Sequence, residues 1–196
     1  MKSTISKTRQ LLIDVARQLF ARVGVRNTTM NDIATASKRG RRTLYTYFKS
    51  KDEIYQAVVQ EELDHIRHSL EDVLKSNLSP DEKLITFIYT RLDTIKESVL
   101  RNGSLRADFF RDIWRVQRER KEIDELDIRM ISQILQEGVE GKIFFMPDIE
   151  VTATILHHAF KGLEVPYIRD AIGAERETRI GNIRNILFNG LRINKK

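Results

Sequence analysis

The stretch Arg41-Arg42-Thr43-Leu44-Tyr45-Thr46-Tyr47-Phe48 decides the fold of the N-terminal part of this 196-residue chain. Leu44 and Phe48 lie four residues apart, so in a helix they share one face and can close a small core. The opposite face is polar, and it begins with two arginines. A helix of this kind is narrow enough to enter the major groove of DNA, with its apolar side held by the protein.

Two further helices are expected upstream of this stretch. Over about residues 6–23, apolar side chains recur at spacings of three and four, and Gly24 follows as a plausible C-cap. Thr29 precedes a short helix over about residues 30–37, where its hydroxyl can cap the first turn. Asp32 favours the positive end of the same helix. Three short helices in a row suggest a helix-turn-helix. The apolar stripe of the first helix is Leu11, Leu12, Val15, Ala16, Leu19 and Phe20.

The rest of the chain also reads as helical. Ser50-Lys51-Asp52-Glu53 fits a capping box that opens a helix to about residue 75. Further helices are expected over about residues 80–102, 105–140, 148–163 and 175–191, and the one over 148–163 ends before Pro166. No convincing strand alternation is present. The sequence therefore predicts an all-α fold, with a helix-turn-helix domain over residues 1–50 and a helical ligand-binding and dimerisation domain over residues 51–196.

The composition narrows the class of protein. Apolar residues make up 41% and charged residues 32%, a balance that suits a globular chain, and there is no cysteine for a disulfide or a thiolate metal site. No apolar run approaches the roughly 18 residues that a membrane span needs. The N-terminus has no apolar segment typical of a secretion signal, so we expect a cytoplasmic protein with no membrane partner.

Charge is distributed unevenly along the chain. Residues 1–51 carry twelve Lys and Arg against two acids, a net +10, so with +6 overall the remainder carries −4. A basic head on a mildly acidic body suggests a polyanion as the partner of the head. A solvated charged surface is the alternative interpretation of the charge alone.

Several elements in register resemble the TetR family of transcriptional regulators. They are Thr29, Ile33-Ala34, the block 43–48 and Lys51, and the match covers roughly residues 6–55. The resemblance implies a homodimer that binds a double-stranded DNA operator and whose C-terminal helices hold a small-molecule effector. It also implies that effector binding changes the spacing of the two heads and releases the operator.

The expected DNA contacts follow from this resemblance and from the chemistry of the side chains. Arginine can grip guanine with two hydrogen bonds, and cations or hydroxyls near helix starts can bind phosphates. The predicted DNA-binding residues are Thr29, Lys38, Arg39, Arg41, Arg42, Thr43, Tyr45, Tyr47 and Lys51. Tyr45 and Tyr47 could instead be partly buried scaffold aromatics. Which of the three arginines reads a base is left open.

The turn before the block departs from the family pattern. Where the family usually has Ala-Gly-Val-Ser, this chain has Ser37-Lys38-Arg39-Gly40. If the turn is unchanged, Lys38 needs a left-handed backbone, at a cost of roughly 1 kcal/mol. Alternatively, the glycine has moved along the turn, and Gly40 can in either case serve as an N-cap.

Two sets of residues in the body are candidates for the functions that the resemblance implies. The predicted effector pocket comprises Tyr89, Phe109, Ile113, Trp114 and His157. Because His157 and His158 point about 100° apart on a helix, at most one of them faces a pocket. The predicted dimer interface comprises Ile155, Ala159, Leu163, Ile180, Ile183 and Leu187, for which intrachain core is the alternative.

Other function classes find little support in the sequence. A cysteine nucleophile, a G-x-S-x-G elbow and a P-loop are all missing, so we expect no enzyme and no catalytic residue. His65 and His68 share a helix face but lack a fuller ligand set, so neither a metal nor a cofactor is predicted. The alternatives to a sequence-specific regulator are a nucleic-acid-binding protein without sequence choice and a helical interaction protein.

Overall fold

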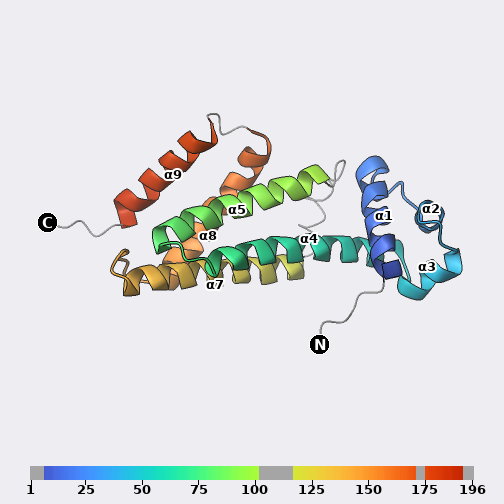
Figure 1. Ribbon diagram of the computed structural model, residues 1–196, viewed down its shortest axis with the longest axis horizontal. Helices are drawn as coiled ribbons and strands as arrows, with labels where there is room; N and C mark the ends of the chain where they lie inside the picture. The colour runs from blue at the N-terminus through green and yellow to red at the C-terminus, as the bar shows by residue number, and fades with distance from the viewer. Residues whose placement is uncertain (1–6, 102–116, 171–174, 192–196) are drawn as a thin grey trace. The chain divides into compact units, whose positions relative to one another are not determined.

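The computed structural model describes residues 7–101, 117–170 and 175–191, and every regular element within them is an α-helix (Figure 1). The all-α prediction is confirmed. Internal packing divides the chain into two units. The described residues of the first are 7–65 and 97–101, and those of the second are 66–96, 117–170 and 175–191. Helix α4 (Lys51–Leu74) runs from the first unit into the second. The proposed boundary near residue 50 therefore stays a prediction.

The first unit is built on α1 (Lys7–Val23), α2 (Met30–Ala36), α3 (Arg41–Tyr47) and the start of α4. Leu44 and Phe48 are fully buried, as the sequence predicts. In α1 the buried face is rotated slightly from the predicted stripe, because Ile13 is buried and Leu11 is only half-buried. We call the buried set the head core: Leu12, Ile13, Ala16, Leu19, Phe20, Ile33, Ala34, Leu44, Phe48, Ile54, Val58 and Val59.

Polar caps set the starts of the short helices. The Thr29 hydroxyl accepts a hydrogen bond from the Asp32 amide at 3.2 Å, and the Asp32 carboxylate accepts one from the Thr29 amide at 2.8 Å. This reciprocal pair satisfies two amides that the first turn of α2 would leave unpaired. At the start of α4, Ser50 Oγ accepts from the Glu53 amide at 3.2 Å, as predicted. The Glu53 carboxylate reaches back to the Lys49 amide, at 2.6 Å.

The second unit contains most of α5 (Pro80–Arg101), together with α7 (Gln117–Glu140), α8 (Ile149–Ile168) and α9 (Arg176–Leu191). Helices α7 and α8 pack against each other, joined by a loop whose Phe144 is buried. The Phe144 ring occupies the space where a side chain at Gly138 would lie, since a Cβ there would stand 2.1 Å from the ring. A side chain at that position would therefore displace the ring from the core. The larger buried side chains of this unit include Leu70, Leu84, Phe87, Ile88, Ile131, Ile134, Leu135, Phe144, Phe160 and Phe188.

Helix α8 corrects one sequence prediction. The sequence predicts an end near Leu163, before Pro166, but the helix continues through Pro166 to Ile168. Proline lacks the amide that would bond the Gly162 carbonyl, and Gly162 is exposed, so water can satisfy that carbonyl. The turn beyond is anchored because Tyr167 is buried and its hydroxyl donates to Asp93.

None of the described helices has the length and apolar character that crossing a lipid bilayer requires.

Candidate DNA-binding surface

Helix α3 presents a polar face that the head core does not cover. Its apolar side is anchored by Leu44 and Phe48, while Arg41 and Arg42 are exposed at its first turn. Tyr45 also points outward, with 48% of its surface exposed. A helix held by one face and open on the other has the geometry that insertion into a groove requires.

The two remaining predicted residues of α3 are less exposed. Thr43 is half-buried, and Tyr47 is half-buried against the head core. For Tyr47 this placement favours the scaffold interpretation over a DNA contact. Tyr45 and Tyr47 are two positions apart, so on a helix they point in different directions, and only the core around them distinguishes their roles.

The turn between α2 and α3 shows which of its residues adopts the left-handed backbone conformation. Lys38 has φ +54°, which is the left-handed region, whereas Gly40 has φ −64° and ψ 148° as an extended N-cap. The left-handed position of the turn is therefore occupied by Lys38, and Gly40 does not take it over. Ser37 is buried, and its hydroxyl donates to the Ala34 carbonyl at 3.1 Å. Arg39 is exposed, and its amide donates to the same carbonyl at 3.1 Å.

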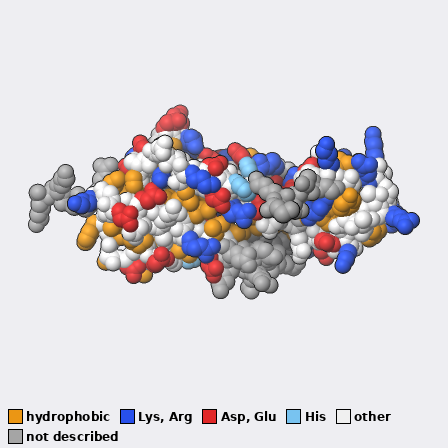
Figure 2. Space-filling model, turned by 60° about the horizontal axis from the view of Figure 1, so that its bottom comes forward, with side chains coloured by type: hydrophobic (Ala, Val, Ile, Leu, Met, Phe, Trp, Pro, Cys, Tyr) orange, Lys and Arg blue, Asp and Glu red, His pale blue; other side chains and the backbone are white. Residues whose placement is uncertain are grey.

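The turn and the start of α3 form a concentration of positive charge. Lys38, Arg39, Arg41 and Arg42 are all exposed, and none of them has an ion-pair partner within the part of the chain that the structure describes. Lys and Arg side chains project from the surface of the α1–α3 region in Figure 2. Uncompensated cations on one surface attract a polyanion and release its counterions on binding.

Thr29 is exposed at the start of α2, but its hydroxyl and its amide both form hydrogen bonds with Asp32. Besides accepting from the Asp32 amide, its hydroxyl donates to the Asp32 carboxylate at 2.7 Å. These side-chain and backbone hydrogen bonds from Thr29 hold the pKa of Asp32 below its usual range. The principal role that the geometry gives Thr29 is therefore to cap α2.

Lys51 has a structural role that sequence reasoning missed. Its ammonium donates to the Val25 carbonyl at 2.7 Å and lies 3.4 Å from the Arg26 carbonyl, so it fastens the start of α4 to the α1–α2 loop. An ammonium has three N–H donors, which leaves one for a phosphate. No local sequence signal indicates this contact, because its partners lie 25 and 26 residues away.

The predicted effector residues fall partly within the second unit. Phe109, Ile113 and Trp114 lie outside the described residues. Tyr89 and His157 are both buried, at 3% and 2% exposure. The Tyr89 hydroxyl and the His157 Nε2 atom have no hydrogen-bond partner in the structure. Buried polar atoms without partners are uncommon, and they are where a ligand or water can be accommodated.

A buried cluster of charges surrounds His157. Its Nε2 lies 3.3 Å from an Asp124 oxygen, without hydrogen-bond geometry, and its Nδ1 lies 3.7 Å from Asp127. Arg91 donates to Asp127 at 2.6 Å and also to Glu164. Burial, followed by the positive charge of Arg91, lowers the pKa of His157 to about 4. The imidazole is therefore neutral at pH 7. The sequence offered no sign that Arg91 and Asp127 are buried.

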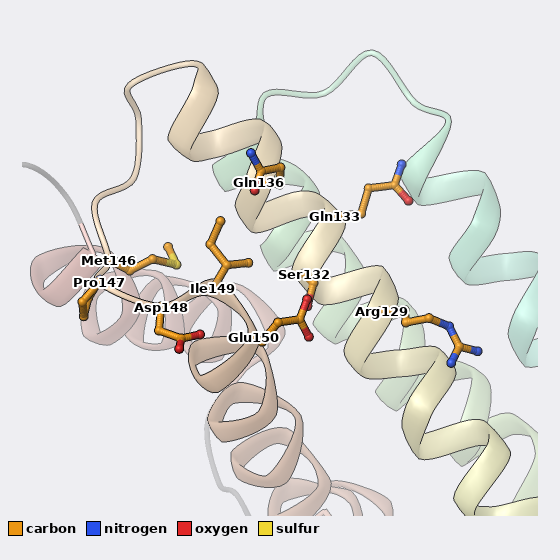
Figure 3. A pocket seen from close by; sticks show the side chains of 9 residues that line it. All are labelled: Arg129, Ser132, Gln133, Gln136, Met146, Pro147, Asp148, Ile149 and Glu150. Atoms are coloured by element: carbon orange, nitrogen blue, oxygen red, sulfur yellow. The ribbon is translucent and has the colours of Figure 1, made fainter.

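The α7–α8 corner has a surface groove of about 580 Å³ (Figure 3). Met146, Pro147 and Ile149 give it an apolar side, and Ser132 lies between the helices with its hydroxyl unpartnered. Its rim carries exposed charges, including Arg129 and Glu150. Neither Tyr89 nor His157 lines this groove, so it is separate from the predicted effector pocket.

The predicted dimer residues divide into two groups in the structure. Ile155 is 62% exposed on α8, and Ala159, one turn on, is also exposed. The others are half-buried and pack against the core of their own chain. This placement agrees with the alternative given above, in which they form intrachain core. They are Leu163, Ile180, Ile183 and Leu187.

Comparison with known proteins agrees with this architecture. Residues 12–58 match the model of the tetR family of bacterial regulatory proteins. The chain is 26% identical over 181 residues to the probable acrEF/envCD operon repressor of Escherichia coli K12, covering 88% of this chain and 81% of that protein. It is 29% identical over 149 residues to the transcriptional repressor KstR2 of Mycolicibacterium smegmatis, covering 73% and 70%. A solved transcriptional regulator from Cytophaga hutchinsonii superposes with a TM-score of 0.75 at 20% identity, covering 94% and 98%.

Proposed function

Because the chain belongs to the tetR family of bacterial regulatory proteins and is a DNA-binding transcriptional regulator, we propose that it represses its target genes by binding a palindromic operator as a homodimer. We further propose that a small molecule bound in the second unit releases the operator. The relatives from Escherichia coli and Mycolicibacterium smegmatis are named as a probable operon repressor and a transcriptional repressor, which supports repression as the sign of regulation.

The observation that carries the DNA-binding proposal is the exposed face of α3. Arg41 and Arg42 stand at its first turn with no acid to neutralise them in the described residues, and Tyr45 lies on the same open side. The N-terminal turn is the part of a recognition helix that contacts base edges. We assign base contacts to these arginines and Tyr45, and phosphate contacts to Lys38, Arg39 and Lys51.

The dimer proposal is supported by the open face of α8. Val151 and Ile155 are 54% and 62% exposed, and Ala159 and Gly162 continue the same face at helical spacing. Small and apolar side chains in such a row allow close packing of a second helix. Two heads related by a two-fold axis would then meet half-sites whose centres lie about 34–36 Å apart, or a multiple of that.

The effector proposal is supported by the unpartnered polar atoms of Tyr89 and His157. Both belong to the second unit, and an apolar effector that carries one or two polar groups and binds beside them would satisfy these atoms. The effector would then stabilise a form of the protein with lower operator affinity, since it can shift the equilibrium only through differential binding. Tyr89→Phe removes one such atom without opening a large cavity, and we expect it to weaken effector binding while operator binding persists.

Selection of bound duplexes from a random pool tests the sequence-specific function. We expect a winning duplex with two-fold symmetry, bound tighter than a random duplex of equal length at every salt concentration. A salt titration with both duplexes separates the base contacts from the phosphate contacts. Equal affinity for the two duplexes would remove the sequence-specific interpretation and leave a non-specific nucleic-acid-binding protein.

A second measurement addresses the effector. Small molecules are screened for release of the selected duplex, and hits are measured on the wild-type protein and on Tyr89→Phe. Arg129 is exposed and lines the separate α7–α8 groove, not the predicted pocket, so Arg129→Ala supplies the control. Molecules that release the duplex equally well from the wild-type protein and from Tyr89→Phe would show that the effector does not bind at Tyr89.

A further inference from the structure

Glu62 is a buried carboxylate at which three helices of the first unit meet. It lies on α4 with 4% of its surface exposed. Its Oε2 accepts a hydrogen bond from Ser98 Oγ at 2.6 Å and one from Arg101 Nη2 at 3.0 Å, both in the last turn of α5. Its Oε1 lies 3.4 Å from Nε of Arg17 on α1. We call Arg17, Glu62, Ser98 and Arg101 the Glu62 clasp.

The charges of the clasp are balanced in a way that holds the carboxylate ionised. Burial by itself raises the pKa of Glu62, but the hydrogen bonds from Ser98 and Arg101 and the positive charges of Arg101 and Arg17 outweigh it, so the pKa lies below its usual value. A buried carboxylate that loses such partners is costly to keep charged. Removing one partner of the clasp therefore costs more than the single hydrogen bond that is lost.

Arg17 connects this clasp to the polar flank of α1, beside the head core. It also pairs with Glu61, the neighbour of Glu62 on α4, and with Asp14 at 3.0 Å. Gln10, two turns earlier on α1, donates to Glu61 at 2.9 Å. The polar flank of α1 is thus tied to α4, and through Glu62 to α5, while its apolar side packs in the head core with α3 and the start of α4.

We propose that Glu62 is a positioning residue for operator recognition. By tying α1 to both α4 and the last turn of α5, it fixes the direction in which α3 points from those two helices, and so restricts the half-site spacing that a dimer accepts. The proposal rests on the proposed function, because only a two-headed protein can measure a spacing. Glu62 itself need not contact DNA.

The experiment uses the full-length protein and the duplex selected above. The same two half-sites are placed at the selected spacing and at spacings changed by one and two base pairs, and a duplex with one half-site is included. The variants are Glu62→Gln, Ser98→Ala and Arg101→Ala. Ser98→Ala and Arg101→Ala remove a donor without removing a core side chain, and Arg101 is half exposed, so both should fold. Arg101→Lys retains the charge and serves as the conservative variant.

Glu97→Ala is the matched control. Glu97 lies on the same turn of α5 and pairs with Arg101 at 3.8 Å, but it makes no contact with Glu62. Removing it therefore changes the charge of this turn and leaves the clasp in place.

We expect the wild type and Glu97→Ala to prefer the selected spacing, and the clasp variants to lose about tenfold of that preference, the effect of one hydrogen bond to a charged group. Their affinity for the single half-site should stay at the wild-type value, and Arg101→Lys should recover part of the preference. Clasp variants that bind every duplex more weakly by one common factor would overturn the proposal and reduce the clasp to fold stabilisation. Unchanged spacing preference in all variants would also overturn it. A wild type that fails to prefer any duplex would instead contradict the proposed function.

Discussion

Replacing Lys38 by glycine separates the backbone cost of this residue from its charge. Its φ of +54° lies in the left-handed region, where an L-residue costs about 1–2 kcal/mol that glycine does not. Glycine adds conformational entropy to the unfolded chain worth about 0.4–1 kcal/mol, which offsets part of the gain. We therefore expect Lys38→Gly to raise the free energy of unfolding by about 0.5–1 kcal/mol.

The same substitution should weaken DNA binding. Lys38 is exposed and unpaired within the described residues, so its ammonium is free to neutralise one phosphate. Losing one such contact lowers the slope of log K against log salt by about 0.9 and weakens selected and random duplexes alike. A more stable protein with weaker, less salt-dependent binding is the expected result.

Lys142 supplies a matched control within the same chain. It follows α7 with φ +55°, is exposed, and belongs to the second unit. Lys142→Gly removes the same charge and the same backbone cost, so we expect an equal gain in stability with no change in the salt slope. Thermal unfolding and salt titrations of both variants make the comparison. If Lys142→Gly gains stability and Lys38→Gly does not, the strain assigned to the turn is refuted. Equal salt slopes for all three proteins would refute the phosphate contact.

Three further predictions concern single residues. If Arg41 contacts guanine, Arg41→Ala should weaken DNA binding by about 1–3 kcal/mol and reduce the base preference at one operator position. An unchanged footprint would indicate that Arg41 contacts the DNA backbone instead. Lys51→Ala should weaken all duplexes alike, reduce the salt slope and lower the free energy of unfolding by about 1 kcal/mol, because the Val25 carbonyl loses its charged donor; full stability in urea would contradict that bracing role. For His157, burial and then Arg91 lower the folded pKa to about 4 from the usual 6.5, so the unfolded chain takes up a proton first as pH falls. The neutral imidazole therefore makes its full contribution to the free energy of unfolding above pH 6.5. As the pH falls towards 4, that free energy decreases by roughly 2–3 kcal/mol. Unfolding measured against pH should be flatter over this window in His157→Gln than in wild type, and parallel curves would refute the assignment.

Long-range contacts account for the residues whose roles sequence reasoning missed. Arg91 and Asp127 look like surface charges on amphipathic helices, yet they are buried against each other 36 positions apart. Lys51 was expected at a phosphate, and its contact with Val25 depends on how α4 meets a distant loop. Pro166 reads as a helix stop, but the continued helix is held by the burial of Tyr167. In each case the partner is remote in sequence, and a local pattern carries no information about it.

The sequence by itself determined the helices, their caps and the outward face of α3. Spacings of three and four residues place Leu44 and Phe48 on one side whatever surrounds them, and a hydroxyl such as that of Thr29 caps a helix through neighbours within three residues. Only the tertiary structure decided that Lys38, and not Gly40, takes the left-handed position, and that Glu62 is buried among donors from two other helices. The physical reason is that periodicity and capping are local, whereas burial and charge pairing depend on which distant segments the folded chain brings together.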